Sequence, residues 1–383
     1  MRTFRLLLVL TVAVPAFAQS VPCPTPASSP PCTVVMSGLD NPRSLALGPE
    51  GALYVAEAGR GGGINGEVCF VAFGAKWSCG TTGKVERLWK GKQHVVVDGL
   101  PSWARAKTAA KPGSRAQGAD GISFRGRGNM YVSIGWERRA DQREALAGEL
   151  GLQFDRLIRV TPDGLIETVA DLAEYEIAHA TPDGESDPFK VVAEPGRELV
   201  IDSGANRLLS VRANGEVSTI ADFPPHDDGR QSVPTSVVLG PDGAYYVSEL
   251  TGVIPGSGFK KGVANIYRLV EGQAPEVFLT GFTLAIDLAF DGIGNLYVLE
   301  HSDVTDKGAA VPPGKLKRVE LNGCTTLADL CPRTTVLDKI PTPTAMLIGP
   351  NDEIYLSING VEAADPKNHG KGTGIGEVWK VQP

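Results

Sequence analysis

Residues 43–59 read RSLALGPEGALYVAEAG, and the same order of residue types recurs along the chain. Each copy has a short apolar run, a turn rich in glycine, proline or aspartate, and a second run with a central tyrosine or leucine. β-Branched and aromatic residues on both sides of such a turn predict an antiparallel hairpin. The other five copies begin at Asp120, Lys190, Thr235, Ile286 and Thr344.

Two further strand-like runs follow each of the first five hairpins. After the third hairpin, for example, they are RLLSVRANG at 207–215 and VSTIADF at 217–223. Four strands in chain order, repeated every roughly 40–50 residues plus insertions, are typical of propeller blades. The sequence therefore predicts an all-β protein, a six-bladed β-propeller of four-stranded blades.

The sixth repeat lacks a fourth strand after its third one. That third strand is GEVWKVQP at 376–383, and no sequence remains after it. An exposed strand edge is normally paired or covered. The stretch TVVMSGLDNP at 33–42 resembles the fourth-strand stretch HVVVDGLPSW at 94–103 and precedes the first hairpin. We therefore predict that residues 33–37 pair with residues 377–381, so that the N-terminal strand closes the ring.

The first 18 residues, MRTFRLLLVLTVAVPAFA, have the features of a secretory signal peptide. Arg2 and Arg5 precede a short apolar core, and Ala-Phe-Ala ends the segment. The apolar run is too short to span a bilayer. We predict cleavage near Ala18, a Pro/Ser-rich extension over 19–32, a propeller over 33–383, and a secreted or periplasmic location without a membrane span.

The charge balance disfavours nucleic acid as a partner. The net charge is −7, whereas nucleic-acid binding needs basic patches. The exception is the basic run WARAKTAAKPGSR at 103–115, with Arg105, Lys107, Lys111 and Arg115. We interpret this run as a solvated loop rather than a docking site.

Six cysteines in an exported chain favour disulfides over free thiols. They fall along the sequence in three neighbouring couples, although six cysteines allow fifteen connectivities. A metal cluster is the rival interpretation, but the sequence has neither C-x-x-C nor a histidine at a suitable spacing. The favoured pairs are Cys23 with Cys32, Cys69 with Cys79, and Cys324 with Cys331.

Five ordered phrases resemble one known family. They are GLDNPRSLALGPEGALYVAEAGRGG, TGKVERLW, DSGANRLLSVRANGEVSTIADFPP, PTSVVLGPDGAYYVSELTG and IDLAFDGIGNLYVLE, and together they resemble the ScyD/ScyE family. The resemblance implies an exported, NHL-like propeller of a type named for a bacterial gene cluster that makes the pigment scytonemin. It supplies no agreed reaction or catalytic residues. Two loops depart from the family pattern, HATPDGESDPFK at 179–190 and GWER at 135–138.

A propeller places certain residues at one mouth of its central channel. The first strand of each blade starts there and the second strand returns, so residues that open the first or close the second converge. The candidate ligand-binding residues of this mouth are Arg43, Glu57, Asp120, Phe189, Asp202, Thr235, Glu249, Asp287, Glu300 and His301. Trp103, Trp136 and Phe189 either rim the mouth or cover apolar blade ends.

Four of these residues are carboxylates at the ends of second strands: Glu57, Asp202, Glu249 and Glu300. Oxygen ligands of this kind suit Ca²⁺. The alternative is structural, since an acid at this position in NHL-like repeats commonly accepts hydrogen bonds from loop backbone. A Ser–His–Asp arrangement around His301 has no nucleophile-elbow motif to support it.

Three functions are compatible with these observations. The first is a propeller of unassigned activity that binds a small molecule or protein outside the cytoplasm, with a link to secondary-metabolite (pigment) biosynthesis implied by the resemblance. The second is a Ca²⁺-dependent, lactonase-like hydrolase or isomerase, with a metal in the channel and a carboxylate or His301 as base. The third, a quinoprotein sugar dehydrogenase, lacks a convincing channel set of histidine and arginine. The fold alone does not choose among them.

Overall fold

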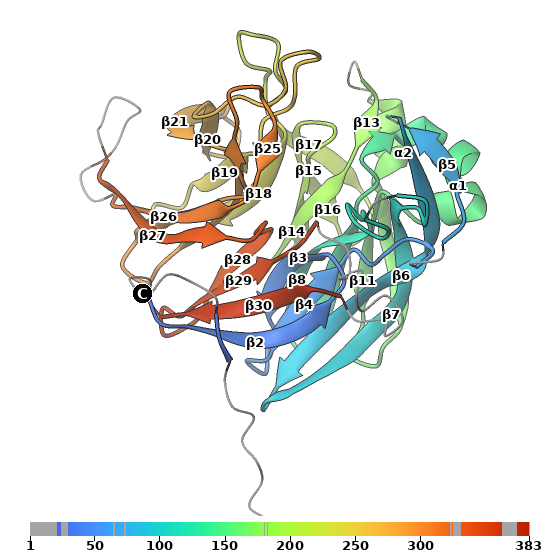
Figure 1. The fold of residues 1–383 in the computed structure, drawn as a ribbon, viewed down its shortest axis with the longest axis horizontal. Coiled ribbons are helices and arrows are strands. Elements are labelled where there is room, and N and C mark those ends of the chain that lie inside the picture. The colour runs from blue at the N-terminus through green and yellow to red at the C-terminus, as the bar shows by residue number, and fades with distance from the viewer. Residues whose placement is uncertain are drawn as a thin grey trace, which may run out of the picture.

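The computed structural model describes residues 21–23, 30–63, 66–72, 74–109, 111–179, 181, 183–321, 324, 331–361 and 374–382. The predicted signal peptide and most of the predicted 19–32 extension lie outside these residues. The described chain is all-β, with six four-stranded antiparallel blades arranged as a propeller (Figure 1). The predicted fold class is therefore confirmed.

Each of the first five blades runs from an inner strand at the channel to an outer strand in chain order. The strands of blade one are β3 (Pro42–Leu47), β4 (Leu53–Glu57), β6 (Ala75–Trp89) and β7 (Lys92–Arg105). Those of blade two are β8 (Ala119–Arg125), β9 (Asn129–Ile134), β11 (Arg156–Val160) and β12 (Ile166–Asp171). Those of blade three are β14 (Pro188–Glu194), β15 (Arg197–Asp202), β16 (Arg207–Arg212) and β17 (Val217–Asp222).

The second half of the chain repeats this plan until the last blade. The strands of blade four are β18 (Pro234–Leu239), β19 (Tyr245–Glu249), β20 (Ala264–Leu269) and β21 (Glu276–Phe282). Those of blade five are β22 (Ala285–Phe290), β23 (Leu296–Glu300), β26 (Gly314–Val319) and β27 (Arg333–Ile340). Those of blade six are β28 (Ala345–Ile348), β29 (Ile354–Ile358), β30 (Gly376–Val381) and β2 (Cys32–Leu39).

Blade six is completed by the N-terminal strand, as predicted. β2 pairs antiparallel with β30, with Val34 opposite Trp379 and Ser37 opposite Glu377. Figure 1 shows the blue β2 beside the red β30. A short strand, β1 (Val21–Pro22), pairs with the other edge of β2 and adds a fifth strand to this sheet. The first and last strands of the described residues therefore belong to one sheet.

The three predicted disulfides are present. The Cα atoms lie 5.3 Å apart in Cys23–Cys32, 5.7 Å apart in Cys69–Cys79 and 5.8 Å apart in Cys324–Cys331. These separations are usual for disulfides. The first bridge joins the segment after β1 to the start of β2, so it fixes the strand that closes the ring.

Insertions build additional structure on the mouth face, the face at which second strands end and first strands begin. β5 (Phe70–Ala72) pairs with the long β6, and β24 (Asp303–Val304) pairs with β25 (Ala310–Val311) after blade five's second strand. In blade two, β10 (Arg138–Arg139) pairs with β13 (Glu185–Ser186). Two further insertions are helical and form η1 (Ala140–Gln142) with α1 (Arg143–Gly151), and α2 (Leu172–Ala178).

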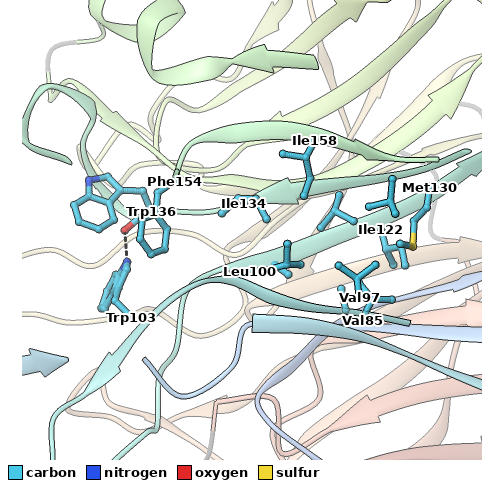
Figure 2. Packing of buried hydrophobic residues seen from close by; sticks show 14 of the residues in the cluster. Val85, Val97, Leu100, Trp103, Ile122, Met130, Ile134, Trp136, Phe154 and Ile158 are labelled. Atoms are coloured by element: carbon cyan, nitrogen blue, oxygen red, sulfur yellow. Dashed lines mark hydrogen bonds between the residues drawn. The ribbon is translucent and has the colours of Figure 1, made fainter. Parts of the chain in front are cut away.

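An aromatic cluster supports the insertions of blades one and two. Trp103, Trp136 and Phe154 are fully buried, and the Trp103 indole N–H donates to the Trp136 carbonyl oxygen at 3.0 Å (Figure 2). Trp77 meets Trp103 edge-on, with 4.7 Å between ring centroids. Trp103 and Trp136 therefore cover apolar blade ends and do not rim the mouth.

The closing strand supplies a test of the ring. Trp379 on β30 is buried opposite Val34, so Trp379→Ala should lower the free energy of unfolding by about 3–5 kcal/mol. The matched control is Lys380→Ala on the same strand, which removes a partly exposed ion pair with Glu353 worth about 0–1 kcal/mol. Chemical denaturation measures both values. Equal losses for the two variants would contradict a ring held by this junction.

Candidate functional site

Three of the four strand-ending carboxylates make the same kind of contact with the backbone. Each accepts a hydrogen bond from the main-chain N–H of a residue just before the first strand of its own blade. The pairs, donor first, are Asp40 with Glu57, Asp187 with Asp202, and Thr283 with Glu300. Because a buried N–H without a partner is costly, these contacts fix the chain where it enters each blade.

Glu249 of blade four has a different set of partners. Its carboxylate accepts from the Tyr267 hydroxyl at 2.9 Å and from the Asn265 N–H at 2.7 Å, and His226 Nε2 lies 2.8 Å from its Oε1. Burial raises the pKa of Glu249. The sequence gives no signal for this role of His226, because its partner lies on another segment of the ring.

These four carboxylates do not form one ligand set for Ca²⁺. In the described part of the chain, no group of three or more His, Cys, Asp or Glu side chains is arranged to hold a metal ion. Glu57 lies 3.3 Å from Lys84 and Glu300 lies 2.7 Å from Lys317, so lysines already balance part of the charge. Metal binding at these residues stays a prediction.

Arg43 and Asp120, predicted at the openings of blades one and two, meet between the blades. Arg43 Nε lies 3.4 Å from Asp120 Oδ1, and both side chains are buried. Burial raises the pKa of Asp120 to about 7, and burial together with the charge of Asp120 raises the pKa of Asp187. A Cβ atom at Gly135 would overlap both carboxylates, so only glycine fits between them.

Asp287 connects the inner strands of four blades. Its carboxylate accepts from Lys190 Nζ of blade three at 3.0 Å, from Ser236 Oγ of blade four at 2.6 Å and from the Met346 N–H of blade six at 2.8 Å. Asp287 itself lies on β22 of blade five. The predicted mouth residue is therefore a buried connector within the channel.

The remaining inner-strand candidates also contact neighbouring blades. Thr235 Oγ1 of blade four donates to the Ala285 carbonyl oxygen of blade five at 3.0 Å. Phe189 is buried in an apolar cluster that includes Ile286 of blade five and Ile358 of blade six. The ligand-binding roles of these residues stay predictions, whereas their contacts between blades are direct observations.

A cavity of about 710 Å³ opens on the mouth face between insertions of blades one, five and six. It is called the mouth cavity below. Its lining residues are Gly74, Ala75, Lys76, Arg105, Thr108, Ala109, Lys111, Ser114, Arg115, His301, Ser302, Ala310, Pro312, Thr342 and Val361. His301 is the predicted site residue among them, and its Nδ1 lies 2.7 Å from the Pro343 carbonyl oxygen.

The sequence interpretation missed most of this cavity. Arg105, Lys111 and Arg115 belong to the run interpreted as a solvated loop, yet they line the mouth cavity. The local excess of basic residues in an acidic chain was the available signal. Nothing in the sequence around Thr342 indicated a place in the cavity, because that place depends on how blade six packs against blade five.

Comparisons with known proteins identify the fold alone. No protein-family model matches the chain, and no curated protein sequence matches it. A gluconolactonase from Xanthomonas campestris is 10% identical, with 96% of this chain and 98% of that one covered and a TM-score of 0.53. A protein from a Thermus species, assigned as an oxidoreductase of the glucose dehydrogenase type, is 14% identical, with 92% and 99% covered and a TM-score of 0.53.

A third solved structure gives the same result. A protein of unknown function from Bacteroides thetaiotaomicron is 8% identical, with 91% of this chain and 74% of that one covered and a TM-score of 0.52. The neighbours include six-bladed propellers of the gluconolactonase type. Because one fold carries many activities, these similarities support the propeller and leave the reaction to the site.

The contact between Asp287 and Lys190 in the channel leads to a prediction about stability. Lys190→Met should lower the free energy of unfolding by about 3–5 kcal/mol, because Asp287 would keep a buried charge without its cation. The double variant Lys190→Met/Asp287→Asn removes that charge and should recover part of the loss. Chemical denaturation of both variants measures the difference. A double variant less stable than the single one would contradict this account.

The two neighbouring buried acids Asp120 and Asp187 predict that the stability of the protein depends on pH. The folded state holds their protons more tightly than the unfolded state, where the usual aspartate pKa is 3.8. Their stabilising contribution is therefore complete below about pH 4 and is lost as the pH rises through the folded-state pKa of each, which for Asp120 is about 7. We compare the free energy of unfolding of Asp187→Asn with that of the native protein at each pH. On going from about pH 5 to about pH 8, this difference should shift in favour of the variant by about 1–2 kcal/mol.

Melting curves at the two pH values measure this difference. The control is Asp98→Asn, which changes an exposed aspartate. The prediction fails when Asp187→Asn and Asp98→Asn show the same pH dependence as the native protein.

Proposed function

We propose that the protein is an exported β-propeller that binds a small molecule in the mouth cavity. The observation that carries the proposal is the cavity itself, about 710 Å³ between insertions of three blades. Small-molecule sites in proteins are commonly about 300–1,000 Å³, with a few polar groups directed into them. Here arginine, histidine, serine and threonine side chains line one space together with alanine, proline and valine.

The contents of the channel support a site at its rim. Asp287, Lys190 and Ser236 fill polar positions between inner strands, and Phe189 packs with apolar residues there. These side chains already have partners within the protein. The insertions of blades one and five instead surround space that no described side chain fills. Binding at the rim therefore leaves the connections between blades intact.

The location and the family relationship are parts of the same proposal. Three disulfides are compatible with an oxidising compartment outside the cytoplasm. Among the described residues, no helix is long and apolar enough to cross a membrane. Together with the signal-like N-terminus and the five ordered phrases, these features support a ScyD/ScyE-like exported propeller. A protein partner at the same rim and a link to pigment biosynthesis are extensions of that relationship.

The lactonase-like alternative has one local observation in its favour. His301 lines the mouth cavity, and the contact of its Nδ1 with the Pro343 carbonyl fixes the orientation of the ring. An imidazole held in this way is a suitable general base.

A blocked cavity tests the proposed function. We expect members of a library of sugar acids, lactones and aromatic amino-acid derivatives to raise the melting temperature by a few degrees, since ligand at about 100 times its Kd adds about 2.7 kcal/mol. Ala310→Trp should abolish the shift by filling the cavity. The matched control Ile293→Trp, on an exposed turn between β22 and β23, should keep it.

The outcomes separate binding from catalysis. Shifts of equal size in Ala310→Trp and in the native protein would place binding elsewhere and overturn the proposal, as would the absence of any shift in the native protein. Acid release from a lactone, measured with and without Ca²⁺ and lost in His301→Gln, would favour the hydrolase.

A further inference from the structure

We propose that the mouth cavity selects an anionic ligand, a small molecule with a carboxylate, sulfate or phosphate group that Arg105 and Arg115 bind. The inference rests on the proposed function, because it assigns the class of ligand to the same cavity. It goes beyond that function by naming the chemistry of the ligand and the residues that recognise it.

The charge around the cavity is of one sign. Lys76, Arg105, Lys111 and Arg115 line it, and no Asp or Glu of the described chain is among its lining residues. This is unusual in a protein whose net charge is −7. Clefts lined by one sign of charge attract ligands of the opposite sign.

The basic run divides between the cavity and the surface. Lys107 makes an ion pair with Glu67 and is not a lining residue. Arg105, Lys111 and Arg115 of the same run line the cavity instead. The run therefore contributes residues both to the exposed surface and to the lining of the cavity.

Arg105 is held in position by the aromatic cluster. The centre of its guanidinium group lies 4.3 Å from the centroid of the Trp77 ring, and Trp77 is buried against Trp103. Cation–π contact of this kind fixes a guanidinium group while leaving its N–H donors at the ring edge available. Partial burial and the nearby charge of Arg115 both lower the pKa of Arg105. An anion between the two arginines would relieve their repulsion.

Backbone strain occurs on two sides of the same cavity. Arg115 has a φ of 53° and Thr342 has a φ of 35°, values that non-glycine residues rarely adopt. The Arg115 N–H donates to the Val361 carbonyl oxygen at 3.0 Å, which holds the strained residue against blade six. Strained residues of this type cluster at ligand sites.

Thr342 provides an independent sign of a missing ligand. It is 5% exposed, it lines the cavity, and its Oγ1 is buried without a hydrogen-bond partner among the described residues. A buried hydroxyl without a partner costs free energy. A ligand oxygen that accepts from Thr342 while the arginines bind the anionic group would satisfy it.

Titration calorimetry at constant ionic strength tests the inference with sulfate, inorganic phosphate and citrate as probes. We expect at least one probe to bind, and Arg115→Gln and Arg105→Gln each to weaken it roughly ten-fold or more, because each removes a charge-assisted hydrogen bond. The control Arg127→Gln removes an exposed arginine on the turn between β8 and β9 and should bind as the native protein does. Arg105→Lys, which keeps the cation over Trp77, separates a folding defect from a loss of recognition.

The results distinguish this inference from the function on which it rests. No binding of any probe, or binding unchanged in both glutamine variants, would overturn the anion site. A neutral compound whose binding is lost in Ala310→Trp but kept in Arg115→Gln would leave the cavity as the binding site and reject an anionic ligand. Anion binding that Ala310→Trp does not affect would place the anion outside the cavity and overturn the inference.

Discussion

The ring depends on the pairing of β2 with β30. Every other blade takes its four strands from consecutive sequence, whereas blade six joins β2 to three strands that lie about 300 residues later in the sequence. Across the junction that this pairing secures, Thr344 Oγ1 donates to the Pro42 carbonyl oxygen of blade one at 2.6 Å. On the other side, Asp287 of blade five accepts from the Met346 N–H of blade six. Loss of the closing strand would leave these contacts without the sheet that supports them.

Buried charged side chains inside the ring hold strands and blades together. Carboxylates at strand ends bind the backbone that enters a blade, and Asp287 connects inner strands with the help of Lys190. A buried carboxylate is costly unless it is hydrogen-bonded and paired, and these groups meet that condition through contacts within the protein. The proposed recognition site lies instead in the insertions of blades one, five and six, whose side chains line the mouth cavity. The residues that hold the blades together and the residues of the proposed site therefore lie in different parts of the sequence.

The sequence predicted what depends on local pattern. Strands and glycine-rich turns recur along the chain, so the blades and the closing strand could be inferred from them. The disulfide couples could be inferred because the cysteines lie close together in sequence. The candidate functional site was harder to predict, because the partners of its side chains come from other blades. The acid at Glu57 looks the same in sequence whether it binds a metal or the Asp40 N–H, and only the folded loop decides. Likewise, Arg105 acquires its position from Trp77, across the long hairpin of β6 and β7.

The topology of blade six also constrains how the chain reaches its folded state. β2 precedes and β30 follows the strands of the other five blades in the sequence, so the edge of β2 that will face β30 stays unpaired until β30 has been synthesised. Contacts between such distant segments form slowly, because a long loop must close before they contribute any stability. The short β1 and the Cys23–Cys32 bridge lie on the opposite side of β2 and can form from local sequence alone. They cover one edge of β2, which reduces the tendency of this strand to pair with another chain before the ring closes.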